Sequence, residues 1–427
     1  MRRAGELGAR VNILSQTRTV DYVNAAIGDD VVRATGESPF GGGGVPPFGE
    51  QRQMLFAAGG HAWNQVGPLP VTAPLALADR LHQLWITPHG VVKAAQRHAA
   101  TVDWVARGGK EYAAVSFTEK GRMSATAFFN AEGLVERVES RVPHPVLGDQ
   151  RVVTEYSGYR DFGGVRFPAK IRQTQDGGGV LELEVSEVRA NAAAELKVPD
   201  AVLKGPAVRV TAEKASEGVW YLAGGSHHSV AIEMKDHVVV VEGPQFDGRS
   251  LPLIAETRKL IPNKPIRYVI NTHYHFDHSG GLRTFVAEGA TMITHSSNKA
   301  FFERAFAAKG KLDPDALSKS GKKAKFLAVG GKHVLTDGAR TLEVLHVKDN
   351  PHNDGLLMVW LPKERLLIEV DVFTPVAAGA AQPAKPNPVS VHLLETIDRM
   401  KLLVDRIVPL HGRIVPFDDL KKAVGRQ

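Results

Sequence analysis

Residues 271–281 read NTHYHFDHSGG and place three histidines and one aspartate within six positions. An apolar run, IRYVIN, precedes this stretch, and two glycines after it open the helical pattern GLRTFVAEG. We therefore expect a tight loop at the carboxyl end of a strand, which is where open α/β sheets place their sites. Imidazole nitrogens and a carboxylate oxygen are suitable ligands for Zn²⁺ and similar divalent ions.

The four ligand-type side chains of this loop cannot all reach one ion. In an extended segment, alternate side chains point to opposite sides. His273 and His275 should then face one way, and we expect the later pair, Asp277 and His278, to face the other. This geometry predicts two adjacent metal ions.

Further ligand-type residues occur where other strands are expected to begin or end. His352 precedes the run GLLMVWLP, Asp371 closes the run RLLIEVDVF, and His411 follows DRIVPL. Taken singly, the histidine is most often a surface or core residue, and the aspartate a turn or cap residue. Together with residues 273–278 they form a complete ligand set for a two-metal centre.

The composition is that of a soluble globular protein with two or three domains, since the 427 residues are 43% hydrophobic and 23% charged. No apolar run reaches the ~18–20 residues of a transmembrane helix. The first residues, MRRAGELGARVNILSQ, carry positive charge without the apolar run of a signal peptide. The chain is therefore either cytoplasmic or the mature form of a periplasmic or exported protein. The absence of cysteine excludes disulfides and thiolate zinc ligands.

The net charge of +7 is spread along the chain, and the one dense lysine run is KSGKKAKF at 319–326. A solvated loop explains this run better than a nucleic-acid surface, which gathers charge on one face. We therefore expect a small-molecule substrate and no nucleic-acid partner.

Two domains are expected, with a boundary near residue 205. Residues 1–200 should form an α+β domain, with helices at 74–85 and 91–106 and an antiparallel meander at about 112–190. A glycine-rich loop is expected at 40–50 and a linker at 191–208. Residues 206–427 alternate strands and helices, which is an α/β pattern. The segment 297–335 is a candidate lid.

The motif HYHFDH matches the HxHxDH pattern of the metallo-β-lactamase-fold hydrolase superfamily, and the later ligand candidates follow in that family's order. The resemblance covers about 206–420 and implies an αββα sandwich with the metals at one edge. It implies one metal bound by His273, His275 and His352. It implies a second bound by Asp277, His278 and His411, with Asp371 bridging both.

Within this superfamily, the chain is more similar to glyoxalase-II, lactonase and esterase-like members than to true β-lactamases. Genuine β-lactamases generally lack the bridging aspartate, and one large group uses a cysteine ligand. This chain has Asp371 and no cysteine. Glu242 stands where many members have an aspartate, which alters the support behind the first histidines.

These features predict a dinuclear metal-dependent hydrolase that uses a metal-bound hydroxide on a small ester, thioester, lactone or amide. Asp277 is expected to orient the nucleophile and relay its proton. Zinc is the default metal, and iron or manganese fit the same ligands. A phosphodiesterase or nuclease, and a metallo-β-lactamase, are the alternative enzymes.

Three other histidines lie near the expected site. His227 and His228, in the loop GGSHHSV, are candidate substrate-binding residues, and His295 ends a strand as a supporting or structural histidine. A third functional class, a binding protein, also stays open. The run YSGYRDFGGVRFPAKI at 156–171 faintly resembles bacterial lipoprotein-carrier proteins, which would favour an exported location and an apolar ligand.

Overall fold

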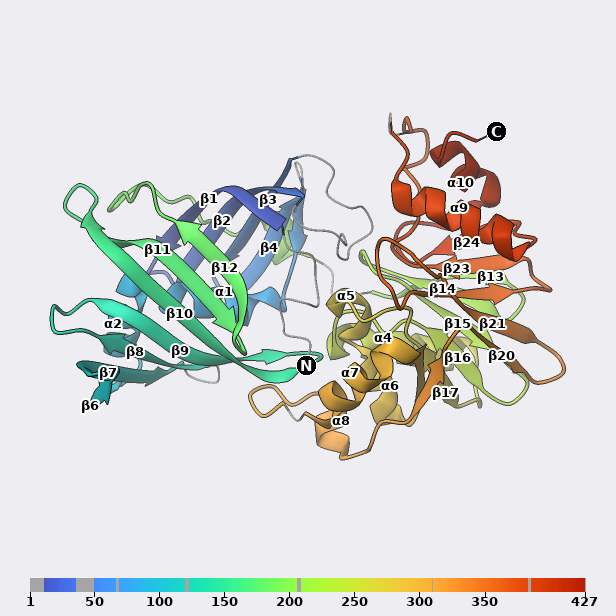
Figure 1. Ribbon diagram of the computed structural model, residues 1–427, viewed down its shortest axis with the longest axis horizontal. Helices are drawn as coiled ribbons and strands as arrows, with labels where there is room; N and C mark the ends of the chain where they lie inside the picture. Colours follow the sequence, from blue (N-terminus) through green and yellow to red (C-terminus); the bar gives the residue numbers. More distant parts are fainter. Residues whose placement is uncertain are drawn as a thin grey trace.

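The computed structural model describes residues 11–35, 50–66, 69–119, 123–205, 209–308, 310–382 and 385–426. The glycine-rich loop expected at 40–50 lies outside these ranges except for its last residue. Among the described helices, none has the length and apolar character needed to cross a membrane. Figure 1 shows a first half built largely of antiparallel strands beside a second half of mixed strands and helices.

Two antiparallel sheets make up the described part of the first half. The first has the order β1-β2-β3-β4-β5, with strands at Val11–Asp21, Ala26–Thr35, Gln51–Ala58, His61–Val66 and Leu69–Thr72. The second has the order β12-β11-β10-β9-β8-β7-β6. In chain order, β6 to β12 span Thr101–Arg107, Lys110–Thr118, Ser124–Phe129, Val135–His144, Gly148–Asp161, Arg166–Gln175 and Gly178–Glu184. The meander predicted for 112–190 is confirmed.

Helices α1 (Ala76–Trp85) and α2 (Pro88–Arg97) contribute buried residues to the core of this half. Thr87 begins α2 by accepting a hydrogen bond from the backbone N–H of Gly90, and Pro88 occupies the first turn, where a missing N–H costs nothing. Leu84 and Trp85 pack against apolar residues of both sheets, so the helices hold the sheets together.

A buried polar triplet joins α1 to the seven-stranded sheet. His82 is fully buried, and its Nδ1 lies 2.9 Å from Glu119 Oε1 while its Nε2 lies 2.9 Å from Ser140 Oγ. Along β9, Val138 and Ser140 lie on one face of the strand and Glu139 lies on the other. The serine therefore faces the helix layer. The triplet therefore fixes the position of α1 from inside the core.

Part of the sequence prediction for this half is wrong. The helix expected over 91–106 ends at Arg97, and Thr101–Arg107 form strand β6. Ala99, with φ of 48°, reverses the chain, and β6 then pairs with β7 through the turn at Gly108 and Gly109. The five-stranded sheet was not predicted, although VNILSQTRTVD alternates apolar and polar residues over part of its length.

The segment expected as a linker, 191–208, is packed along the first sheet where it is described. It contains the short helix α3 (Asp200–Leu203), whose Val202 is buried. Leu196 and Val198 pack in the same cluster, against Trp63 of β4. The apolar side chains at these three positions explain why the segment lies on the sheet.

The second half contains two mixed sheets. One has the order β13 to β19, with strands at Thr211–Ser216, Val219–Ala223, Ser229–Glu233, Val238–Val241, Ile266–Ile270, Thr291–His295 and Phe326–Val329. The other has the order β20 to β25, at Lys332–Thr336, Thr341–His346, Leu357–Leu361, Leu366–Glu369, Arg406–Pro409 and Val415–Pro416. Strands β16 to β19 run parallel, as do β23 and β24.

Helices cover the outer face of each sheet (Figure 1). The first sheet is covered by α4 (Asp247–Leu260), α6 (Leu282–Glu288), α7 (Ser296–Ala307) and α8 (Ala316–Ser320), and the second by α9 (Pro388–Met400) and α10 (Phe417–Ala423). Apolar residues such as Val239 and Val359 fill the space between the sheets. The order of layers is therefore helix, sheet, sheet, helix, which confirms the predicted αββα sandwich.

The lid interpretation of 297–335 is wrong. Phe301, Phe302 and Phe306 of α7 are buried in the core between that helix and the first sheet. The later part of the segment forms α8, β19 and β20. The aromatic residues that suggested a mobile cover are instead core residues.

Replacing His82 with alanine should lower the free energy of unfolding by ~2–4 kcal/mol, because Glu119 would stay buried without its histidine. Equilibrium urea denaturation measures this change. Lys93→Ala, on the exposed side of α2, should alter the free energy of unfolding by less than about 0.5 kcal/mol. Equal effects of the two substitutions would contradict a structural role for the triplet.

Candidate metal centre

The histidine-rich loop begins directly after β17, at the carboxyl end of the parallel strands. His273 and His275 lie in the loop, and Asp277 and His278 lie in the one-turn helix α5 (Phe276–Ser279). The glycines that follow are required sterically. A Cβ on Gly280 would lie 1.8 Å from the carbonyl oxygen of Gln245, so the loop approaches the backbone after β16 more closely than any other residue allows.

Three imidazoles and one carboxylate converge in a first group. His273 Nε2 lies 2.9 Å from His275 Nδ1, 3.3 Å from His352 Nε2 and 3.3 Å from Asp371 Oδ2. All four ligand atoms lie within 4.8 Å of one another, and all four residues are buried. The first ligand set that the sequence predicted is therefore assembled in space.

A second group lies beside the first. His278 Nε2 is 3.3 Å from His411 Nε2 and 3.5 Å from Asp277 Oδ2. His227 joins them, with its Nε2 3.2 Å from Asp277 Oδ2 and its ring centroid 4.4 Å from that of His411. The four ligand atoms again lie within 4.8 Å of one another.

Asp371 contacts both groups. Its Oδ2 lies 3.1 Å from both His278 Nε2 and His352 Nε2, and its Oδ1 lies 2.9 Å from His411 Nε2. One carboxylate thus spans the space between the two histidine sets. Its backbone φ of 64° is a conformation that aspartate adopts at a cost, which is typical of residues held for function.

The structure brings together all seven residues proposed as metal ligands, and it adds His227 to the second set. The sequence analysis had placed His227 and His228 together as substrate-binding candidates. The two side chains diverge, since His228 packs against Tyr221 with ring centroids 5.1 Å apart and belongs to neither group. Nothing in the loop sequence GGSHHSV distinguishes the two histidines.

Hydrogen bonds outside the groups orient several ligands. His411 Nδ1 donates to the carbonyl oxygen of Ser226, which leaves its Nε2 free to bind. The buried Arg249 donates to the carbonyl oxygen of His227 and holds that loop against the site. His295 accepts from the backbone N–H of Ser297 and begins α7, which agrees with its predicted structural role.

Electrostatics at the site favour bound cations. Burial lowers the pKa of His273 to about 4, so its imidazole is neutral and has a free electron pair. Burial alone would also lower the pKa of His278, but the carboxylates of Asp371 and Asp277 raise it to about 10. The position of His278 is therefore one where the surroundings stabilise positive charge.

Two buried glutamates support the loops behind the ligands. Glu242 accepts from the backbone N–H of Thr272 at 2.7 Å and lies 4.0 Å from His278 Nδ1. Burial raises its pKa to about 7. Glu369 accepts from the backbone N–H groups of Val372 and Phe373, beside Asp371. Glu242 thus supports the start of the loop and α5.

The donor set fits a pair of divalent ions. Neutral imidazole nitrogens and carboxylate oxygens suit zinc and other borderline metals, and a carboxylate shared by two groups is a common bridge between two ions. Convergence of four imidazoles on one carboxylate is costly for a purely structural cluster, because several ring nitrogens face one another. These residues are therefore the candidate metal centre of the chain.

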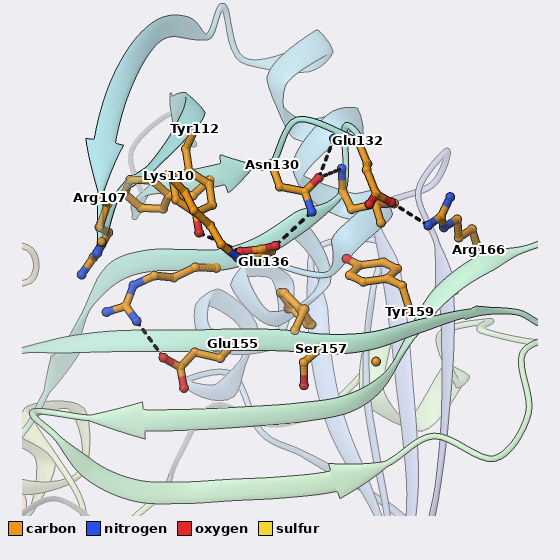
Figure 2. A pocket seen from close by; sticks show the side chains of 16 residues that line it. Arg107, Lys110, Tyr112, Asn130, Glu132, Glu136, Glu155, Ser157, Tyr159 and Arg166 are labelled. Atoms are coloured by element: carbon orange, nitrogen blue, oxygen red, sulfur yellow. Dashed lines mark hydrogen bonds and ion pairs between the residues drawn. The ribbon is translucent and has the colours of Figure 1, made fainter.

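A cavity of about 690 Å³ lies elsewhere, on the seven-stranded sheet of the first half (Figure 2). Its charged groups pair with one another. Glu155 is 2.8 Å from Arg137, Glu132 is 2.8 Å from Arg166, and Glu136 accepts from Tyr112 and Asn130. Its lining includes Tyr156, Tyr159 and Arg166 of the run that resembles lipoprotein-carrier proteins, and it includes none of the candidate metal ligands.

Comparison with known proteins identifies the fold around the metal centre. Residues 222–409 match the family model of the metallo-beta-lactamase superfamily. This segment has the metallo-beta-lactamase fold, as the motif HYHFDH led us to expect.

Individual relatives are distant. The 2,4-dinitroanisole O-demethylase subunit alpha of Nocardioides sp. (strain JS1661) is 26% identical over 166 residues, which are 39% of this chain and 47% of that protein. The matched part thus spans about half the length of that relative. Metallo-beta-lactamase from Pontibacter korlensis is 16% identical, with a TM-score of 0.39 over 51% of this chain and 100% of that one. Rubredoxin oxygen:oxidoreductase from Desulfovibrio gigas is 19% identical, with a TM-score of 0.39 over 50% and 59%.

Replacing His227 with alanine should weaken metal binding by the second group about tenfold or more while sparing the first group. Metal content, measured by mass spectrometry after dialysis against limiting zinc, should then fall from two ions per chain toward one. His228→Ala is the neighbouring control and should retain the wild-type content. Equal metal content in both variants would show that His227 is not part of the ligand set.

Proposed function

We propose that the chain is a dinuclear metal-dependent hydrolase that acts on a small ester, thioester, lactone or amide, in the manner of glyoxalase-II and lactonase-like enzymes. The observation that carries this proposal is the position of Asp371, whose two oxygens contact histidines of both groups at 2.9–3.1 Å. True β-lactamases generally lack this aspartate, and the chain has no cysteine to serve in its place.

When bound, the two ions supply Lewis-acid activation of a water molecule and of the carbonyl under attack. The chain supplies the ligands and a hydrogen-bond acceptor for that water. Burial alone would raise the pKa of Asp277, but the charge of His278 and the hydrogen bond with His227 outweigh it and hold that pKa below its ordinary value. Asp277 is therefore ionised at neutral pH, and its carboxylate can accept a hydrogen bond from an attacking water and orient it.

His227 keeps this carboxylate in place. Its Nε2 lies 3.2 Å from Asp277 Oδ2, and its Nδ1 lies 2.7 Å from Ser226 Oγ. Asp277 is partly exposed and His227 retains 9% exposure, whereas His273 is fully buried. The second group is thus the side of the centre that a substrate reaches.

A second candidate function follows from the relative with which the chain shares 26% identity, a 2,4-dinitroanisole O-demethylase subunit. Its name describes removal of a methyl group from an aromatic ether. The same activated water that attacks an ester can attack an aromatic carbon bearing a methoxy leaving group. Hydrolysis of an activated aryl methyl ether is therefore the alternative activity.

Substitution of His352 or His273 by alanine should remove metal and turnover together, because each residue belongs to the first ligand group. We expect the loss of at least one ion per chain and a fall in kcat of about 10³-fold or more. Metal analysis and steady-state kinetics on the same preparation measure both. Full activity at unchanged metal content in either variant would refute the assignment.

A small substrate panel discriminates between the candidate reactions. The metal-loaded protein should hydrolyse p-nitrophenyl acetate or a lactone, and it should not hydrolyse bis-p-nitrophenyl phosphate or a β-lactam. Removal of the metals with a chelator should abolish the activity, and adding zinc should restore it. Turnover of 2,4-dinitroanisole without turnover of any ester would favour the ether-cleaving alternative instead.

A further inference from the structure

The turn between β9 and β10 of the first half is built into the core of the second half. Figure 1 shows this long hairpin reaching α5 and α8. Val146, at its turn, is fully buried and belongs to the same cluster as Phe301 and Phe302 of α7. Leu147 packs against that cluster as well. The hairpin tip is therefore fixed rather than loosely apposed.

Polar contacts fix the same turn from both sides. His144 Nδ1 accepts from the backbone N–H groups of Val146 and Leu147, both at 3.1 Å, so the turn is stabilised by a neutral imidazole. Burial lowers the pKa of His144 to about 4, which agrees with this acceptor role. At the start of β10, Asp149 accepts from the backbone N–H groups of Lys311 and Leu312 in the second half.

The hairpin reaches the metal-binding loop itself. The ring of His144 packs against that of Phe276, with centroids 6.0 Å apart and planes at 64°. Phe276 lies between His275 and Asp277, which belong to the two ligand groups. One residue of the first half thus contacts the aromatic residue at the centre of the motif HYHFDH.

The two aromatic residues of this loop have different surroundings. Tyr274 points into the core and packs on Phe301, with ring centroids 6.1 Å apart. Phe276 is 43% exposed, although His275 and His278 in the same loop are buried. Burying an exposed aromatic ring is favourable, so a ring in this position offers binding energy to an apolar group beside the metals.

We propose that the β9–β10 hairpin is a substrate-selecting wall of the metal centre, in which Phe276 and His144 contact the apolar acyl or aryl part of the substrate. This inference rests on the proposed hydrolase function and names the substrate class within it. The preferred substrates are esters or related compounds whose acyl group carries an aromatic ring or a chain longer than acetyl. The first half of the chain is then part of the active site.

The test compares p-nitrophenyl acetate with p-nitrophenyl phenylacetate, which differ only in the apolar acyl group. The variants are Phe276→Ala, Phe276→Leu and His144→Ala in the full-length, metal-loaded protein. Trp104→Ala is the matched aromatic control, because Trp104 is an exposed residue of the first half on edge strand β6. Metal content is measured for every variant.

For the phenylacetate ester, Phe276→Ala and His144→Ala should lower kcat/KM about tenfold, mainly through KM, since they remove an apolar contact. For the acetate ester, the fall in kcat/KM should be smaller than for the phenylacetate ester, because its acyl group offers less apolar surface to these side chains. Phe276→Leu should restore part of the preference, and Trp104→Ala should change neither rate. An unchanged ratio of the two kcat/KM values in both alanine variants, at unchanged metal content, would overturn the proposal.

Calorimetric binding of free phenylacetate and acetate separates this inference from the proposed reaction. Wild-type protein should bind phenylacetate more tightly than acetate, and Phe276→Ala should abolish the difference. If the wild type hydrolyses neither ester but keeps this Phe276-dependent preference, the substrate-selecting role of the hairpin is supported and the hydrolase proposal fails. If it binds both acids equally, the wall is refuted whatever the activity.

Discussion

One carboxylate, that of Asp371, sets the arrangement of the whole edge of the sandwich. It is buried, and four imidazoles lie within 2.9–3.3 Å of its two oxygens. Such crowding of ligand atoms is stable only when shared positive charge offsets the cost of burial. The elements that deliver these side chains must therefore end at one point, which constrains the lengths and registers of β17, β22, β23 and β24.

The supporting residues follow from the same constraint. Glu242 and Asp371 both have positive φ, at 68° and 64°, and each follows a strand that ends at the site. Such backbone conformations cost about 1–3 kcal/mol each for residues other than glycine. The core between the two sheets, where residues such as Val241 and Ile368 are fully buried, holds them in place. Stability of the scaffold thus offsets strain at the metal centre.

The sequence predicted the second half well because its signals are local. Apolar runs mark the buried strands, and ligand-type residues at their ends meet wherever strand ends meet, so the seven candidate ligands proposed from the sequence lie close together in the structure. His227 escaped assignment to the ligand set because it enters from a loop whose path depends on Arg249 and Asp277. No local pattern distinguishes it from His228.

The first half was harder to predict because its strands bury only part of their surface. β6 is exposed along nearly its whole length, and it reads as a continuation of helix α2 until the reversal at Ala99 is known. The hairpin tip at Val146 likewise looks like an ordinary turn, since Phe301 and Phe302 of its cluster lie more than 150 positions later. Packing between residues far apart in the sequence produces no periodic pattern of apolar residues.

The insertion of Val146 also bears on where the two halves of the chain can be separated. A chain cut at residue 205 would lose a fully buried side chain from the core beside α7, along with the acceptor that holds residues 311 and 312. The excised second half would carry an apolar hole next to the histidine-rich loop and would be prone to aggregate. The position in the sequence where the two halves join is therefore not the boundary between their packed cores.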